Sequence, residues 1–284
     1  MSNRFLVVVR AGDRSLHPGW TRSLAGRDWD LLVSYFGDDR ERFRDAGCRR
    51  IDDKGPKWRG LHAFFTREDF WQGYDYVMLP DDDLAIEQET VSRLFARAAS
   101  RDLELCQPAL SWWSYYSHAI TVRHPSFALR FTDFVEIMTP CFSRRHLERC
   151  LPTFAESVSG WGFDRIWPRM LAQAAPCAAI VDECVVTHTR PVGGPNYAAL
   201  RELGSTPHEE GRRLLAMHGI SPRQAPRVLA AIDCDGRLLR AEDPQDAATI
   251  EELCRRDRLE FIASRRRIDT PRVTLPRGYT NRTG

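Results

Sequence analysis

Short apolar runs alternate with segments of helical spacing in the first part of the chain. The runs at residues 5–9, 30–35 and 76–79 are dominated by apolar side chains and show little polar alternation. Such runs suit strands that are buried on both faces, as in a parallel sheet covered by helices. Residues 86–99 carry helical spacing and lie between the third run and a fourth at 103–108. This order predicts an α/β fold built around a mostly parallel, mixed sheet flanked by helices.

The middle of the chain continues this pattern. Residues 131–138 alternate apolar and polar side chains well enough to predict a strand, and residues 143–151 predict a helix. A glycine-hinged loop then leads into a helix expected to begin near Phe163. A last strand is expected at 178–187, ending just before His188.

The character of the sequence changes near residue 205. A short helix is expected at 209–218, a hairpin at 228–240 around an Asp-Gly turn, and a helix from Asp243 to about residue 264. The last residues are rich in arginine and lack a core-forming pattern, so we expect a basic, flexible tail. The predicted organisation is an α/β domain at 1–204, a small C-terminal helix-hairpin-helix extension at 205–264 and the tail at 265–284.

Composition excludes some classes of function. The 284 residues contain 41 Lys+Arg and 39 Asp+Glu, so the net charge of +2 gives no reason to expect a nucleic-acid partner. No stretch approaches the roughly 18 apolar residues of a membrane span, and no signal-peptide pattern is visible. The eight cysteines form no CxxC pair, which favours reduced thiols over a zinc site. We expect a cytoplasmic protein, with a tail that could contact an anionic membrane surface.

Only two of the basic residues are lysines, and both lie in the segment DDKGPKW. Lys54 and Lys57 are thus three positions apart in a chain that otherwise uses arginine. An ammonium group is a compact point charge suited to phosphate, which favours a phosphate contact here. The alternative is that both lysines simply lie on a solvated loop.

Three adjacent aspartates follow the run at 76–79. Asp81, Asp82 and Asp83 repel one another, yet they stand where a parallel strand delivers its carboxyl end, the edge at which α/β sheets bind ligands. Alternation places Asp81 and Asp83 on one side, where two oxygen ligands suit Mg²⁺ or Mn²⁺ with positions left for a diphosphate. The alternative is an acidic loop that caps the next helix, which a single aspartate would satisfy.

An apolar strand ending in Asp-x-Asp resembles the metal-binding motif of GT-A glycosyltransferases. The wider pattern is similar to the DUF707 family, uncharacterised proteins with a GT-A-like fold. Asp-x-Asp alone is a weak signal, whereas several segments in order are a specific one. The matching segments, together covering about residues 5–192, are GDRSLH (12–17), KGPKW (54–58), YDYVMLPDDDL (74–84), QPALS (107–111), FVEIMTPCFSR (134–144), SGWGFD (159–164) and, more loosely, HTRP (188–191).

The resemblance implies a nucleotide and metal site at the ends of the first and third strands. A histidine after a late strand supplies a third metal ligand in many GT-A enzymes, and His188 stands at that place. The implied metal ligands for Mn²⁺ or Mg²⁺ are Asp81, Asp83 and His188. The implied donor-binding residues are Arg10, Asp13, Ser15, Lys57 and Asp81. A surface ion pair for Arg10 and Asp13, and a purely structural histidine, are the alternatives.

The segment SGWGFD is the second implied centre. Its two glycines allow the backbone to bend near a ligand, and the face of Trp161 suits a sugar ring. In inverting GT-A enzymes a carboxylate near this place removes the proton of the acceptor hydroxyl, and Asp164 matches that position. Glu136, a charge in an otherwise apolar segment, is a second candidate base or an acceptor contact. Asp164 could instead cap the helix that follows it.

An aromatic segment, SWWSYYSH at 111–118, fits an acceptor-side loop for carbohydrate, although Trp112 and Trp113 could equally be core residues. Together these features predict a metal-dependent glycosyltransferase that moves a sugar from a nucleotide-sugar donor to an acceptor hydroxyl, with inversion. The first alternative is a non-catalytic nucleotide- or glycan-binding module of the same fold. The second is a metal-dependent phosphohydrolase, which lacks a second histidine-and-aspartate cluster for a two-metal centre.

Overall fold

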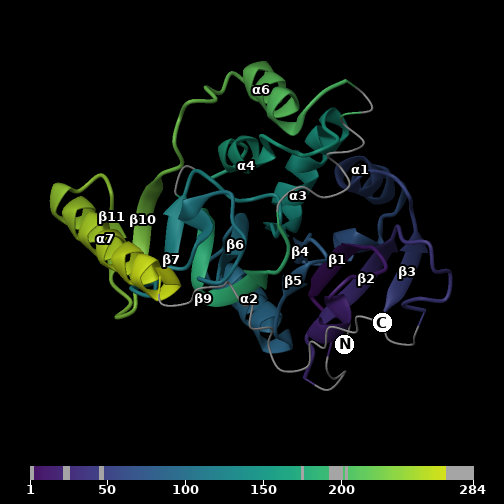
Figure 1. The fold of residues 1–284 in the computed structure, drawn as a ribbon, viewed down its shortest axis with the longest axis horizontal. Coiled ribbons are helices and arrows are strands. Elements are labelled where there is room, and N and C mark those ends of the chain that lie inside the picture. The colour runs from purple at the N-terminus through teal and green to yellow at the C-terminus, as the bar shows by residue number, and fades with distance from the viewer. Residues whose placement is uncertain are drawn as a thin grey trace.

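A computed structural model describes residues 3–21, 26–44, 48–173, 176–191, 201 and 204–266 (Figure 1). These residues form one large mixed sheet with helices on both faces. Its strand order is β11-β10-β7-β9-β6-β8-β4-β1-β2-β3, with β5 paired to β9 off this path. The strands are β1 (Phe5–Ala11), β2 (Trp29–Tyr35), β3 (Arg49–Asp52), β4 (Tyr76–Met78), β5 (Leu84–Ala85), β6 (Leu105–Leu110), β7 (Phe127–Thr132), β8 (Cys141–Ser143), β9 (Ala178–His188), β10 (Val228–Asp233) and β11 (Leu238–Arg240).

The helices cover the sheet in two groups and add one helix at its end. The α-helices are α1 (Lys57–Arg67), α2 (Gln88–Ser100), α3 (Arg144–Cys150), α4 (Phe163–Ile166), α6 (Pro207–Met217) and α7 (Pro244–Arg266). Short 3₁₀ helices lie at η1 (His17–Trp20), η2 (Phe70–Gly73), η3 (Ala119–Thr121), η4 (Leu151–Glu156) and η5 (Trp167–Arg169).

The direction of the strands places several carboxyl ends at one edge. β1 pairs in parallel with β2 and β4, and β6 pairs in parallel with β9; these include the two longest ladders among the described strands. β8 lies between β4 and β6 and is antiparallel to both, so β4 and β6 point the same way. The ends of β1, β4, β6 and β9 therefore meet at the same edge of the sheet, where open α/β sheets bind ligands.

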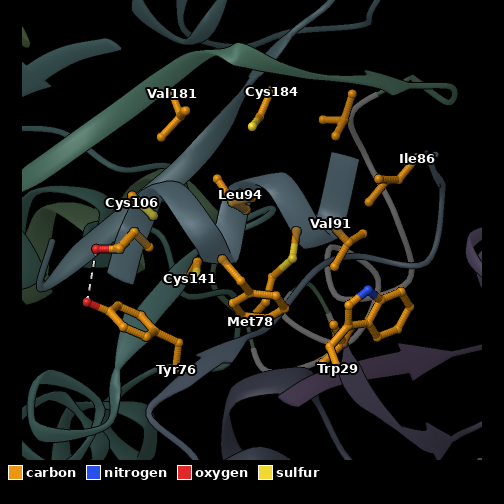
Figure 2. Close-up of a cluster of buried hydrophobic side chains, with 14 of the residues drawn as sticks. Trp29, Tyr76, Met78, Ile86, Val91, Leu94, Cys106, Cys141, Val181 and Cys184 are labelled. Atoms are coloured by element: carbon orange, nitrogen blue, oxygen red, sulfur yellow. Dashed lines mark hydrogen bonds between the residues drawn. The ribbon is translucent and has the colours of Figure 1, made fainter. Parts of the chain in front are cut away.

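One hydrophobic core lies between the sheet and α2. Figure 2 shows Met78 of β4 and Trp29 of β2 close to Val91 and Leu94 of α2. Tyr76 belongs to the same core, and its hydroxyl donates a hydrogen bond to the carbonyl of Ala98 (Figure 2). Each apolar side chain buried here contributes roughly 1.5–3 kcal/mol, so this core fixes β1, β2 and β4 relative to one another.

The other face of the sheet is covered by α1, α3, α4 and α6. Leu6 and Val8 of β1 point into this second core because side chains alternate across a strand. Trp58 of α1 lies at its centre, with the ring of Phe154 at 4.9 Å and that of Trp167 at 5.1 Å. The second core therefore joins α1 to the segment that carries α4.

The C-terminal extension continues the sheet. The expected hairpin is confirmed as β10 and β11, and β10 pairs antiparallel with β7. The expected helix is confirmed as α7, whose first turn is capped by Asp243 Oδ1, which accepts from the backbone N–H groups of Gln245 and Asp246. Ile250 of α7 packs with Leu239 and Phe127, and α7 lies beside β10 and β11 at the end of the sheet (Figure 1). Residues 267–284 of the expected tail lie outside the described residues.

The predicted fold class, a mostly parallel mixed α/β sheet flanked by helices, is confirmed. The strand predicted at 131–138 is wrong, because β7 ends at Thr132 and a loop follows. In that loop the N–H of Val135 donates to the carbonyl of Asp164, and the N–H of Glu136 donates to Gln107 Oε1. Partners from other elements thus satisfy the backbone that a neighbouring strand would otherwise pair.

For Lys57 the alternative of a solvated loop is wrong. Lys57 is not on a solvated loop but is the first residue of α1, and it is 9% exposed. Among the described residues, no helix is both long and apolar enough to span a membrane.

Candidate functional site

A cleft of about 690 Å³ lies at the edge where the carboxyl ends of β1, β4 and β9 meet. Its lining residues come from the segment after β1, the start of α1, the aspartates after β4, the loop after β6, the loop after β7, the SGWGFD segment and the end of β9. Ten of the sequence-predicted residues line this cleft: Arg10, Asp13, Lys54, Lys57, Asp81, Asp83, Glu136, Trp161, Asp164 and His188.

The three aspartates after β4 have three different sets of partners. Asp82 Oδ2 accepts a 2.8 Å hydrogen bond from the N–H of Gly12, and its Oδ1 lies 3.7 Å from Arg190 Nη1. Asp81 and Asp83 instead contact Lys57 and His188. Asp82 therefore holds the segment after β1, while the other two aspartates pair with a lysine and a histidine that line the cleft.

Lys57 is held by three oxygen atoms. Its Nζ lies 2.5 Å from Asp81 Oδ1, 3.1 Å from the carbonyl of Leu79 and 3.2 Å from the carbonyl of Ile137. An ammonium group has three N–H donors, so these contacts use all of them. The arrangement neutralises Asp81 and links α1 to the end of β4 and to the loop after β7.

Asp83 and His188 form a partly buried pair. His188 Nδ1 lies 2.8 Å from the carbonyl of Tyr115, which can only accept, so Nδ1 carries a hydrogen. Nε2 is then directed to Asp83 Oδ2 at 3.4 Å. Burial lowers the pKa of His188, but the hydrogen bond and the charge of Asp83 outweigh it and raise that pKa overall. The other carboxylate oxygen, Asp83 Oδ1, is buried without a hydrogen-bond partner.

This pair fits one part of the predicted metal site. Asp83 Oδ1, which has no hydrogen-bond partner, and Nε2 of His188 are an oxygen and a nitrogen donor suited to Mn²⁺, which would replace the proton on Nε2. Asp81 fits less well because Lys57 already neutralises it. Within the described residues, no group of three or more His, Cys, Asp and Glu side chains is arranged to hold a metal ion. Asp83 and His188 are therefore the residues that would hold a cation, with further positions left to a ligand.

Arg10 and Asp13 lie at the end of the cleft near β1 and β2. Arg10 is buried, and its guanidinium bonds Ser34 Oγ at 2.9 Å and Asp53 Oδ2 at 2.5 Å. Burial lowers the pKa of Arg10, against the charge of Asp53. Asp13 accepts from the hydroxyl of Tyr35, and this hydrogen bond is the main reason that the pKa of Asp13 is lowered.

Ser15 does not line the cleft. It is buried, and its hydroxyl lies 2.7 Å from His17 Nδ1. The structure thus gives Ser15 a role in holding the segment after β1, and its predicted donor contact is not supported by its place in the fold.

Glu136 lies in the wall of the cleft on the loop after β7. It is 7% exposed, and its Oε2 atom is buried without a hydrogen-bond partner. Burial, together with the charge of Asp164, raises the pKa of Glu136 to about 8. The loop conformation rather than strand alternation directs this carboxyl group to the cleft.

Asp164 enters the same part of the cleft from α4. Its side chain is 13% exposed, and Oδ2 lies 3.9 Å from His118 Nε2. Burial raises the pKa of Asp164 to about 7 and lowers that of His118 to about 4. The N-cap residue of α4 is Gly162, so Asp164 is within the first turn and does not cap the helix. A carboxyl group with this pKa can accept a proton near neutral pH.

The loop that carries Trp161 is held by hydrogen bonds to Glu210 of α6. Glu210 Oε2 accepts from the N–H of Ser159 at 2.8 Å and from the hydroxyl of Ser157 at 2.9 Å, and Oε1 accepts from the N–H of Val158 at 2.9 Å. These hydrogen bonds outweigh burial and lower the pKa of Glu210. The expected glycine bend is present, with φ of 80° at Gly160 and 105° at Gly162.

The two predicted aromatic acceptor residues at the start of the loop after β6 lie elsewhere. Trp112 donates from Nε1 to the carbonyl of Arg123 and packs 6.2 Å, centre to centre, from the ring of Phe261 in α7. Neither Trp112 nor Trp113 lines the cleft. Their predicted contact with an acceptor therefore has no support from their position, and Trp161 is the tryptophan that the cleft contains.

Some cleft and supporting residues were missed by the sequence reasoning. His118 lies at the end of the aromatic segment and faces Asp164. Arg190 lies in the HTRP segment, in which the sequence analysis predicted a role only for His188. Glu210 gave no signal, because nothing local in the sequence shows that a helix 50 residues later supports SGWGFD.

Comparison with known proteins gives similarity only at the level of solved structures. No protein-family model matches the chain, and no curated protein is similar to it. The chain resembles S. aureus TarS 1–349 in complex with UDP-GlcNAc, with 12% identity, a TM-score of 0.46, and coverage of 68% of this chain and 60% of TarS. For TarS 1–349 in a second crystal structure the identity is 12%, the TM-score 0.46 and the coverage 64% and 59%.

A third similar structure is that of a mycobacterial protein, with 17% identity, a TM-score of 0.44, and coverage of 78% of this chain and 76% of that one. The chain thus spans about 60% of the TarS chains that it matches. With identities and TM-scores this low, the chemistry of the site rests on this chain's own residues.

Proposed function

We propose that this protein is a GT-A-like, metal-dependent glycosyltransferase that moves a sugar from a nucleotide-sugar to an acceptor hydroxyl with inversion. The observation that supports this most is the single cleft that combines the Asp83–His188 pair at the strand ends with the buried carboxyl group of Asp164. The first can serve a donor diphosphate, and the second can serve an acceptor hydroxyl. A transferase needs both in one place.

The proposal includes membership of the DUF707 family. The segments that carry that resemblance lie far apart in the sequence, yet most of them contribute residues to this one cleft. Cleft residues come from GDRSLH, KGPKW, YDYVMLPDDDL, FVEIMTPCFSR, SGWGFD and HTRP. Convergence on one cleft is expected if these segments form a functional site, and it supports the resemblance.

The donor half of the cleft is assigned to the strand ends. Asp83 and His188 would hold Mn²⁺ or Mg²⁺, which when bound would offset the negative charge on a diphosphate leaving group. Lys57 orients Asp81 and adds a positive charge beside it. Arg10 and Asp13 shape the end of the cleft near β2, where the nucleoside would lie.

The acceptor half is assigned to Asp164, Glu136 and Trp161. In the proposed step the acceptor oxygen forms a bond to the anomeric carbon, and the bond from that carbon to the diphosphate oxygen breaks. The diphosphate leaves with the electron pair, and the hydroxyl proton passes to Asp164. Burial of the cleft favours this transfer because it holds the pKa of Asp164 near neutrality.

The experiment is transfer from a panel of nucleotide-sugars by the wild type and Asp164→Asn, followed as release of nucleoside diphosphate. Because Asp164 must be ionised to accept a proton, kcat/KM should rise with pH through about 7 in the wild type. Asp164→Asn should lower kcat by roughly 10²–10⁴-fold while nucleotide binding remains. Unchanged turnover in a folded Asp164→Asn protein would exclude this residue as the base.

One observation favours the non-catalytic binding module as a second candidate. Asp81 and Asp83 are balanced by Lys57 and His188 within the chain itself. A binding module would retain nucleotide affinity in Asp164→Asn and show no turnover in the wild type. A metal-dependent phosphohydrolase would instead release phosphate from simple phosphate esters, which the proposed transferase should not do.

A further inference from the structure

The two halves of the cleft differ in charge. The half at the strand ends contains both acids and cations, and four of its cations have an acidic partner: Arg10 with Asp53, Lys54 with Asp38, Lys57 with Asp81 and Arg190 with Asp82. Arg14 lines the same half. The other half is lined by Ser117, His118, Glu136, Ile137, Met138, Ser159, Trp161 and Asp164. Within 117–164, all of it described, no lysine or arginine lines the cleft.

The carboxyl groups of this second half are buried more than nearby positive charge compensates. Glu136 is nine-tenths buried with Oε2 unpartnered. The ionisable side chain closest to Asp164 in its ion-pair contacts is His118 at 3.9 Å, and burial outweighs the charge and backbone N–H of Arg165. His118 does not supply a charge, because burial lowers its pKa to about 4. Arg165, next to Asp164 in sequence, is directed away and donates to the carbonyls of Ser221 and Pro222. A buried carboxyl group without a partner is costly, so a ligand that supplies donors is expected here.

We propose that the acceptor half of the cleft binds a carbohydrate that carries a protonated amine, such as an amino sugar, with the ammonium group donating to Glu136. An ammonium group offers three charged N–H donors, which suit the unpartnered Oε2 of Glu136, and Trp161 adds an aromatic ring to the same half. An anionic acceptor is disfavoured, because it would repel either carboxyl group once ionised, whereas an ammonium group favours the ionised form. That this ligand is an acceptor rests on the proposed transferase function. That the cleft binds an amine rests on Glu136.

The test compares two ligands that differ only at nitrogen. Binding of a glucosamine disaccharide and of its N-acetylated counterpart is measured by calorimetry at neutral pH, with glucuronic acid as an anionic probe. A charge-assisted hydrogen bond contributes roughly 1.5–3 kcal/mol, so the amine form should bind about tenfold or more tightly than the acetylated form. Glu136→Gln should remove this preference, and Glu251→Gln, an exposed carboxylate on α7, should keep it.

Equal binding of the two disaccharides, or tighter binding of glucuronic acid, would overturn the amine class. If Glu136→Gln is poorly folded by its melting curve, Glu136→Asp provides the second variant, since its shorter carboxylate should weaken the preference for the amine form. The same samples are tested for turnover of nucleotide-sugars. Amine-selective binding without any turnover would support the ligand class and count against the transferase alone. Turnover without amine selectivity would support the transferase and count against the amine ligand class.

Discussion

At the scale of single residues, the candidate site is a set of carboxyl groups whose charges are balanced in different ways. Lys57 balances Asp81, and His188 balances Asp83, whereas Glu136 and Asp164 are buried with little compensation. The sequence could predict which acids line the cleft, because they stand at strand ends and near glycines. It could not predict their partners, because Lys57 reaches Asp81 across 24 positions and Asp83 reaches His188 from another strand.

Glu136 should lower the stability of the free protein as pH rises. Its folded pKa of about 8 lies above the ordinary 4.5, so ionisation opposes folding and stability is lost between these two pH values. Glu136→Gln should therefore be more stable than wild type by at least about 1 kcal/mol at pH 8, and the difference should vanish near pH 4. Urea unfolding across pH measures this.

The groups that face Glu136 are Asp164, Asp81 and His188, and their titration contributes to both wild type and variant. Glu251→Gln is the matched control, since that exposed side chain should change stability by little at any pH. A Glu136→Gln advantage that does not grow with pH would show that the buried carboxyl group is compensated after all.

Gly160 should be intolerant of any side chain. Its φ of 80° is a left-handed conformation, and an added Cβ would collide with the indole nitrogen of Trp58. Gly160→Ala should destabilise the protein by roughly 1–3 kcal/mol, measured by chemical denaturation. Gly73→Ala is the control, because nothing lies within 4 Å of its added Cβ and its φ is ordinary. Equal effects of the two changes would contradict this packing.

At the scale of elements, α6 links the C-terminal extension to the candidate base. Its Glu210 holds the backbone of Val158 and Ser159, and Gly211 of the same helix allows close approach of Trp161, since a Cβ there would lie 3.1 Å from Trp161 Cβ. The segment resembling a known family ends before α6. The sequence therefore predicted the helix but not its contact with SGWGFD, which is a long-range contact without a local signal.

Removing Glu210 should loosen this loop. Glu210→Ala leaves several buried donors unpaired, each costing about 1–3 kcal/mol, so we expect a loss of roughly 3 kcal/mol in the free energy of unfolding. Hydrogen exchange should show faster exchange of the Val158 and Ser159 amides, while amides of β1 stay protected. Arg212→Ala, on the exposed side of α6, should change neither quantity. Protection of both loop amides in Glu210→Ala would mean that α6 does not hold the loop.

At the scale of the whole molecule, the direction of the strands was predictable and much of their pairing was not. Continuous apolar runs predicted β1, β2, β4, β6 and β9, because burial on both faces leaves a clear pattern. The short strands β3 and β8 were missed, since three or four residues carry little periodicity. Residues 131–138 were wrongly predicted as a strand, because apolar residues in a buried loop can alternate as they do in a strand. The position of the cleft could be predicted from the direction of the strands. The pairing of its charges could not, because the partners come from distant parts of the chain.

The central claim is that Asp83 and His188 hold a divalent cation that binds a nucleoside diphosphate. The most direct measurement is a thermal-shift panel of UDP, GDP, CDP and ADP, each with and without Mn²⁺, on wild type and Asp83→Asn. A ligand that binds only the folded state raises the melting temperature by mass action. We predict a shift with at least one nucleotide that requires Mn²⁺ and is lost in folded Asp83→Asn. A shift that is independent of Mn²⁺, or that survives in Asp83→Asn, would contradict the claim, as would no shift with any nucleotide.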